Sequence, residues 1–187
     1  MAAEAAMGAT GPGDRAPEDR APEDRSPGGA TGGHGADATF RIRTADASDL
    51  DAIMAIEQAS FAGSAWERET MRAELASEWG RYLVAEAPDG HALGYAGLRA
   101  VGDEGDVQTI AVEEGARGRG IGRALLAELL AEAGRRGVAE LFLEVRADNP
   151  AARTLYESVG FREIGVRPRY YQPEDVDAVV MKREERR

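Results

Sequence analysis

A glycine-rich turn between a predicted strand and a predicted helix is the segment best suited to bind a ligand. The turn, Arg117-Gly118-Arg119-Gly120-Ile121-Gly122-Arg123, follows the apolar segment 107–112 and precedes the helix-forming segment 124–130. The first turn of a helix has unpaired backbone N–H groups and the positive end of the helix dipole, so it can bind an anion. Glycines at alternate positions let backbone atoms, rather than Cβ atoms, face that anion. Arg117, Arg119, Arg123 and the more distant Arg135 are expected to add positive charge around the turn. The segment therefore predicts a phosphate or pyrophosphate site.

The glycine spacing argues against two familiar nucleotide-binding motifs. A dinucleotide fingerprint has the pattern Gly-x-Gly-x-x-Gly, whereas the glycines here fall as Gly118-x-Gly120-x-Gly122. A P-loop has Lys followed by Ser or Thr after its glycines, and Arg123-Ala124 occupies that place. Both nucleotide interpretations are therefore weak. For the motif taken alone, an ordinary strand-to-helix loop stays open as the alternative.

Composition argues against several kinds of site. The chain of 187 residues has no cysteine and only two histidines, His34 and His91, so a thiolate nucleophile is excluded and a metal centre is not expected. No apolar run approaches the roughly 20 residues of a membrane span, and no basic region followed by an apolar core begins the chain, so we expect a cytoplasmic protein without a membrane partner. The formal net charge of −11 argues against nucleic-acid binding, which needs a basic surface.

The sequence divides into a tail and one domain. Residues 1–38 are almost all Ala, Gly, Pro, Asp, Glu and Arg, and Ala16-Pro17-Glu18-Asp19-Arg20 is repeated at 21–25. Such a segment cannot bury enough apolar surface to offset the entropy lost on ordering. We therefore expect a disordered tail over 1–38 and a folded domain over 39–187.

Within the domain, hydrophobic periodicity and turn residues predict the order β, α, α, β, β, β, α, β, α, β, β. Strands are expected at 39–43, 82–85, 92–98, 107–112, 141–145, 161–166 and 178–182, and helices over 50–58, around 71–77, 124–130 and 151–159. Asp46 or Ser48 is expected to cap the first helix, and Asn149 the last, which ends at Gly160. Residues 167–175 are expected to form a loop. The order indicates a mixed α/β fold, not a run of βαβ repeats.

Two motifs resemble the GCN5-related N-acetyltransferases. The turn matches the family's pyrophosphate loop, Arg/Gln-x-x-Gly-x-Gly/Ala, as Arg117-x-x-Gly120-x-Gly122. The segment Leu143-Glu144-Val145-Arg146-Ala147-x-Asn149-x-x-Ala152-x-x-Leu155-Tyr156-x-x-x-Gly160-Phe161 is similar to the signature of RimI-type ribosomal-protein alanine N-acetyltransferases, and Arg167-x-x-Tyr170-Tyr171 and Asp177-Ala178-x-x-Met181 extend it. The resemblance covers nearly all of 39–182. It implies a mixed, mostly antiparallel sheet of about seven strands with helices on both faces.

The resemblance assigns catalytic roles to two residues. Acetyl transfer to an amine requires that an ammonium lose a proton, that a tetrahedral intermediate be stabilised, and that the leaving thiolate be protonated. Glu144, near the end of its strand, matches the family's general base, and Tyr156, on the next helix, matches its general acid. A phenol is protonated at neutral pH and can donate to a thiolate. The structural alternatives are a strand glutamate that faces solvent and a tyrosine of the core.

The resemblance also implies acetyl-CoA as co-substrate, with no metal. The backbone of Ile110, Ala111 and Val112 is expected to hold the pantetheine arm and the acetyl carbonyl. Gly118, Arg119, Gly120, Ile121, Gly122 and Arg123 are expected to hold the pyrophosphate. Asn149 matches a further coenzyme contact of the family.

The acceptor side departs more from the family. Ser64-Ala65 stand where a Pro-Trp pair is frequent, and Glu113-Glu114-Gly115-Ala116 lacks the usual proline and brings two acids towards the phosphates. Trp66, Tyr170 and Tyr171 are candidates for a peptide-binding rim, with packing in the core as the alternative for all three.

The function implied by the resemblance is transfer of acetyl from acetyl-CoA to a protein N-terminal α-amine, with a ribosomal protein as the expected partner. The absence of cysteine agrees with direct attack and no covalent enzyme intermediate. Two alternatives stay open. The same machinery could acetylate a small-molecule amine or a lysine side chain, or the chain could be a non-catalytic coenzyme-binding adaptor.

Overall fold

The computed structural model describes residues 5–6 and 40–185. Over 40–185 the strands and helices follow the predicted order, and β1 is a strand that the sequence did not predict. The strands are β1 (Ala5–Ala6), β2 (Arg41–Thr44), β3 (Gly80–Glu86), β4 (Ala92–Val101), β5 (Glu104–Val112), β6 (Glu140–Arg146), β7 (Arg162–Tyr171) and β8 (Val176–Glu184). The helices are α1 (Leu50–Phe61), α2 (Arg68–Leu75), α3 (Ile121–Arg135) and α4 (Pro150–Ser158), with short 3-10 turns at Ala47–Asp49, Ala62–Ser64 and Glu114–Ala116. Among the described residues, no helix is long and apolar enough to cross a membrane.

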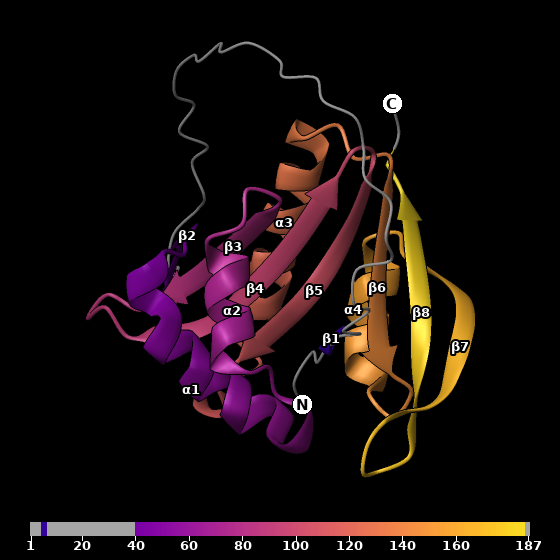
Figure 1. The fold of residues 1–187 in the computed structure, drawn as a ribbon, viewed down its shortest axis with the longest axis horizontal. Helices are drawn as coiled ribbons and strands as arrows, with labels where there is room; N and C mark the ends of the chain where they lie inside the picture. Colours follow the sequence, from indigo (N-terminus) through magenta and orange to yellow (C-terminus); the bar gives the residue numbers. More distant parts are fainter. Residues whose placement is uncertain (1–4, 7–39, 186–187) are drawn as a thin grey trace.

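One mixed sheet carries the fold, in the order β2-β3-β4-β5-β6-β8-β7, and β1 pairs with β5 beside this path. β5 and β6 are parallel, whereas the other neighbours along the path are antiparallel. Helices α1 and α2 cover one face, and α3 and α4 cover the other (Figure 1). The predicted fold class, a mostly antiparallel sheet of about seven strands with helices on both faces, is confirmed.

The two central strands, β5 and β6, are paired only where both begin. Glu104, Gly105 and Asp106 of β5 pair with residues 140–142 of β6, and beyond them the two strands separate. A β-bulge accompanies the separation, because Gly97 of β4 pairs with Thr109 while the next residue pairs with Val107. Bulges bend a strand and increase its local twist. The C-terminal half of β5 therefore has an edge that β6 does not use.

The short strand β1 lies on that edge. Ala5 is opposite Ile110 and Ala6 is opposite Thr109, in antiparallel register. β1 also lies next to β6, so it sits between the two separated strands (Figure 1). It is the described part of the predicted 1–38 tail, and the rest of that tail lies outside the described residues.

Two hydrophobic clusters fill the space between the sheet and its helices. The first cluster lies under α3 and α4 and includes Leu129 and Tyr156, while the second lies under α1 and α2 and includes Ile53 and Met71. Alternate residues of β6, Leu141, Leu143 and Val145, belong to the first cluster. Successive side chains of a strand point to opposite faces, so Glu144 projects to the side of α1.

Local capping explains where the helices begin. The carboxylate of Asp46 accepts a hydrogen bond from the backbone N–H of Ser48, and that of Asp49 accepts from the N–H of Asp46, both at 2.8 Å. Asn149 caps α4 by accepting from the N–H of Ala152 at 3.0 Å. By contrast, α3 begins at Ile121, after the N-cap residue Gly120, without a hydrogen bond from a capping side chain. Its first N–H groups are therefore left for another partner.

Two expectations from the sequence are wrong. The expected loop 167–175 is largely strand, because β7 continues to Tyr171, which pairs with Val176 of β8 after a shift of register. Arg135 was grouped with the positive charges of the glycine-rich turn. It lies in the last turn of α3, roughly 21 Å along the helix from Ile121, and bonds to Glu132. It therefore adds no charge at the turn.

Candidate functional site

The glycine-rich turn lies at the C-terminal end of β5 and opens α3. Gly118 and Gly120 have φ angles of 76° and 80°, a region that glycine adopts readily. A Cβ atom built on either glycine would meet no heavy atom within 4 Å, so both positions face open space. Arg117 Nε donates to the carbonyl of Val112 at 3.1 Å and ties the turn to β5. The uncapped start of α3 and its open glycines fit an anionic group such as a pyrophosphate.

Glu144 of β6 forms an ion pair with an arginine of β7, although β6 and β7 are not adjacent in the sheet. Arg167 of β7 reaches across β8, and its Nη1 lies 2.6 Å from Oε1 of Glu144. The Glu144 side chain is 14% exposed and that of Arg167 is 46% exposed. The second oxygen of Glu144, Oε2, is buried and has no hydrogen-bond partner within the described chain. The carboxylate is thus largely buried, with one oxygen left for a donor.

Tyr156 belongs to α4 and is completely buried. Its ring packs edge-on against Phe161, with 5.9 Å between centroids, so the ring is part of the first cluster. Its hydroxyl has no hydrogen-bond partner among residues 5–6 and 40–185. Burial raises the pKa of Tyr156, so the phenol is protonated at neutral pH. Packing accounts for the ring but not for the hydroxyl, since an unsatisfied buried hydroxyl costs about 1–3 kcal/mol.

Unpartnered buried polar atoms are concentrated in the predicted site. In the described chain they are Trp66 Nε1, Glu74 Oε2, Arg81 Nε, Glu144 Oε2 and Tyr156 Oη. Three of these five belong to predicted site residues. Because native proteins satisfy nearly all buried polar groups, such a concentration fits a site whose partners arrive with a ligand.

Comparison with known proteins decides the family. Residues 50–161 match the model of the acetyltransferase (GNAT) family. The N-alpha-acetyltransferase RimI of Mycobacterium tuberculosis is 42% identical over 142 residues, which cover 73% of this chain and 87% of that protein. The chain belongs to the GNAT family.

Further relatives and a solved structure agree. A Mycobacterium leprae protein is 43% identical over 148 residues, 76% of this chain, but this chain spans only 40% of that protein's length. The crystal structure of the ribosomal-protein-S18-alanine N-acetyltransferase from Escherichia coli superposes with a TM-score of 0.71 at 35% identity, covering 78% of this chain and 93% of that one. The chain is thus an N-acetyltransferase with acetyl-CoA as co-substrate, as predicted.

Of the residues predicted to hold the coenzyme, those of β5 and of the glycine-rich turn are continuous with each other. Ile110, Ala111 and Val112 form the end of β5, at the edge that β6 leaves unpaired, and the turn follows directly. Asn149 uses its side-chain oxygen to cap α4. In the described residues, no group of three or more His, Cys, Asp or Glu is arranged to hold a metal ion.

The three acceptor-side aromatics differ in burial. Trp66 and Tyr171 are 7% and 2% exposed and belong to the second cluster, whereas Tyr170 is half-buried. Tyr171 lies under the guanidinium of Arg146, with 5.2 Å between the guanidinium carbon and the ring centroid. Burial, followed by hydrogen bonding to Glu144, raises the pKa of Tyr170 to about 12. Tyr170 is thus the rim candidate next to Glu144.

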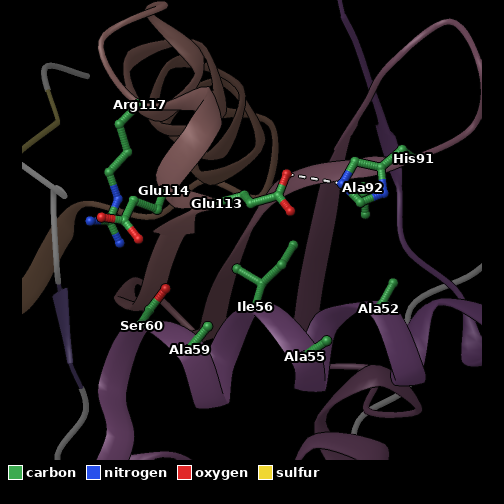
Figure 2. Close-up of a pocket in the computed structure, with 10 residues that line it drawn as sticks. All are labelled: Ala52, Ala55, Ile56, Ala59, Ser60, His91, Ala92, Glu113, Glu114 and Arg117. Atoms are coloured by element: carbon green, nitrogen blue, oxygen red, sulfur yellow. Dashed lines mark hydrogen bonds and ion pairs between the residues drawn. The ribbon is translucent and has the colours of Figure 1, made fainter.

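A pocket of about 460 Å³ lies between α1 and the end of β5 (Figure 2). It is lined by Ala52, Ala55, Ile56, Ala59, Ser60, His91, Ala92, Glu113, Glu114 and Arg117. Glu113, expected to approach the phosphates, instead bonds to His91 Nε2 at 2.9 Å. None of the predicted catalytic or coenzyme residues lines this pocket, which borders the glycine-rich turn through Arg117.

Two charged residues of this region were not assigned a role from the sequence. The contact of Arg167 with Glu144 depends on strand order, because β8 separates their strands, so local periodicity could not reveal it. Glu57 is 1% exposed on α1. The available signal was a carboxylate three residues after Met54, within the helix's apolar stripe.

Proposed function

We propose that this acetyltransferase acts on the N-terminal α-amino group of a protein, of the ribosomal-protein alanine type. The M. tuberculosis relative is named an N-alpha-acetyltransferase, and an E. coli relative, 37% identical over 142 residues, is named for alanine of ribosomal protein bS18. The observation that carries the proposal is the pair of unpartnered buried atoms, Oε2 of Glu144 and the hydroxyl of Tyr156. A ribosomal-protein acceptor places the reaction in the cytoplasm.

In the proposed reaction, the acceptor ammonium first gives a proton to Glu144, directly or through water. The amine then attacks the acetyl carbonyl, and backbone N–H groups of residues 110–112 stabilise the oxyanion. When the tetrahedral intermediate collapses, the C–S bond breaks and the thiolate takes the proton of Tyr156. The nitrogen loses its second proton as the amide forms, and this proton restores the phenol, directly or through water. Glu144 projects from one face of the sheet and Tyr156 lies beneath the other, so base and acid serve the reacting carbon from opposite sides of the separated strands.

The orientation of Glu144 supports its role as base. Arg167 and Tyr170 hold it from the side of β7. Because Arg167 engages Oε1, the carboxylate is fixed while Oε2 keeps its lone pairs for the amine. A fixed base needs no reorganisation when the amine arrives.

A peptide panel tests the proposal. The purified chain is given acetyl-CoA with an Ala-starting peptide, the same peptide with a blocked N-terminus and an internal lysine, and a polyamine, and products are located by mass spectrometry. We expect acetyl only on the free α-amine. Acetylation of the lysine or the polyamine would assign a different acceptor, and acetyl-CoA binding without any transfer would indicate an adaptor.

The catalytic assignment is tested on the same peptide. Glu144→Gln is expected to lower kcat about 10²- to 10⁴-fold, because it removes the base, with the Kd of acetyl-CoA unchanged. Glu140→Gln is the matched control, since Glu140 lies on the same strand and pairs with Lys182 away from the separation. Equal kcat values for the two variants would remove Glu144 from the chemistry.

A further inference from the structure

A buried carboxylate on α1 holds the loop that precedes α2. Oε1 of Glu57 accepts a hydrogen bond from the backbone N–H of Trp66 at 2.8 Å, and both groups are buried. Oε2 accepts a hydrogen bond from the hydroxyl of Tyr95 on β4. Glu57 thus joins the loop 62–66 to the sheet from within the second cluster.

The network continues to the strand that precedes the glycine-rich turn. The Tyr95 hydroxyl also lies 3.2 Å from Oγ1 of Thr109, which is fully buried on β5. Burial, followed by the charge of Glu57, raises the pKa of Tyr95 well above its usual value, so the phenol stays a donor to the carboxylate. Because both oxygens of Glu57 already accept hydrogen bonds, Glu57 is not placed to take a proton from an incoming amine.

An ionised group at this position is costly for the fold alone. Burying a carboxylate requires that its lost hydration be replaced, and a well-packed apolar residue often serves stability equally well. The buried Glu57 carboxylate instead fixes the backbone of Trp66. The indole N–H of Trp66 is buried and has no partner in the described chain. A buried donor of this kind, in a loop held by Glu57, fits a peptide carbonyl as its partner.

We propose that Glu57 is a positioning residue for the acceptor. It fixes the loop between α1 and α2 so that the indole N–H of Trp66 donates a hydrogen bond to a backbone carbonyl of the acceptor peptide. The inference rests on the proposed transfer to a protein N-terminus and adds to it the group that recognises the peptide backbone. Glu57 sets how the peptide binds, and the chemical step belongs to other residues.

Steady-state kinetics with an Ala-starting peptide separate this role from a structural one. Glu57→Met removes the acceptor of the Trp66 N–H at similar side-chain length, and Trp66→Phe removes the indole donor. Each is expected to raise the KM of the peptide about tenfold, the loss of one buried hydrogen bond, with the KM of acetyl-CoA within about twofold. Asp51→Met is the matched control, because it makes the same carboxylate-to-apolar change on α1 at an exposed residue. An unchanged peptide KM in Trp66→Phe, or a proportional rise of both KM values in Glu57→Met, overturns the proposal.

Hydrogen exchange gives a readout that does not depend on turnover. In Glu57→Met, which lacks an acceptor for the Trp66 N–H, the amide of Trp66 is expected to exchange about tenfold faster than in the wild type, while amides of β4 and α3 keep their rates. A Trp66 amide that stays protected overturns the positioning role even if the enzyme is active. If the wild type acetylates no peptide, the proposed function fails on that result, whereas the exchange rates still decide whether Glu57 holds the loop.

Discussion

At the scale of single residues, the site differs from the rest of the protein in how its buried polar atoms are satisfied. Tyr82 and Tyr156 are both buried tyrosines, but Tyr82 donates to Gln108 at 2.9 Å whereas the Tyr156 hydroxyl has no partner in the described chain. Folding stability alone favours the first arrangement. A buried hydroxyl without a partner in the described chain is better explained by a reaction partner, such as a departing thiolate.

Replacing Tyr156 by Phe therefore has opposite effects on stability and on activity. The free energy of unfolding is expected to stay equal or to rise by about 1 kcal/mol, because an unsatisfied buried hydroxyl is removed. The value of kcat is expected to fall about 10²-fold or more, since the leaving thiolate loses its acid. Urea unfolding measures the free energy of unfolding, and steady-state assays measure kcat. Tyr82→Phe, the control, should lose stability and keep kcat, and the reverse pattern would make Tyr156 a structural residue.

The glycine-rich turn gives a second prediction at this scale. At Gly120, with φ of 80°, alanine is strained, and its Cβ would occupy the open space in which we place the pyrophosphate. Gly120→Ala is expected to raise the Kd of acetyl-CoA about tenfold or more, as measured by calorimetry. Gly115→Ala is the control, because Gly115 also faces open space but its φ is not positive. Equal affinities of the two variants would contradict the pyrophosphate assignment.

At the scale of elements, the sequence predicted what local signals determine. Asp46 and Asn149 were expected as helix caps and both act as caps, and Gly120 lies at the bend that opens α3. Contacts between distant strands were not predictable. The ion pair from Arg167 to Glu144 depends on β8 lying between β6 and β7, and that order is set by tertiary packing. The strand predicted at 161–166 was too short for the same reason. Pairing with β8 extends β7 to Tyr171.

The burial of the three acceptor-side aromatic residues could not be predicted from the sequence either. An aromatic residue in a loop can line a binding site or fill the core, and its type does not distinguish the two. The rings of Trp66 and Tyr171 pack in the second cluster, although the indole N–H of Trp66 has no partner in the described chain, and Tyr170 is half-buried. The departure of residues 64–65 from the family pattern therefore falls in a loop whose position is fixed from inside, by Glu57.

The entry to α1 gives a prediction about pH. Hydrogen bonding from Arg43 lowers the pKa of Asp49, whose carboxylate also caps the helix. With a folded pKa below the unfolded one, Asp49 stabilises the fold above about pH 4, and this is lost as pH falls through the lowered pKa. Asp49→Ala should cost about 1 kcal/mol at pH 7, with a difference from wild type that shrinks below pH 4 in urea unfolding. A difference independent of pH would show that the charge contributes nothing.

At the scale of the whole molecule, the sheet consists of two parts that share a short parallel junction. One part contains β2 to β5, the other contains β6 to β8, and three residue pairs join them. The candidate base and acid belong to the second part, whereas the glycine-rich turn belongs to the first. We therefore expect the coenzyme to lie along the separation, against the edge of β5.

β1 occupies that same edge, so we expect it to compete with the coenzyme. Its pairing with Thr109 and Ile110 uses backbone groups at the position expected to hold the pantetheine arm. Replacing Ala5 and Ala6 by proline removes two N–H donors and should lower the apparent Kd of acetyl-CoA by about two- to fivefold, because a larger fraction of molecules is competent to bind. Serine at both positions keeps the backbone N–H donors, so the Kd of acetyl-CoA should equal that of the wild type. Calorimetric titration of the three proteins decides this, and identical affinities would mean that β1 leaves the edge of β5 open to the coenzyme.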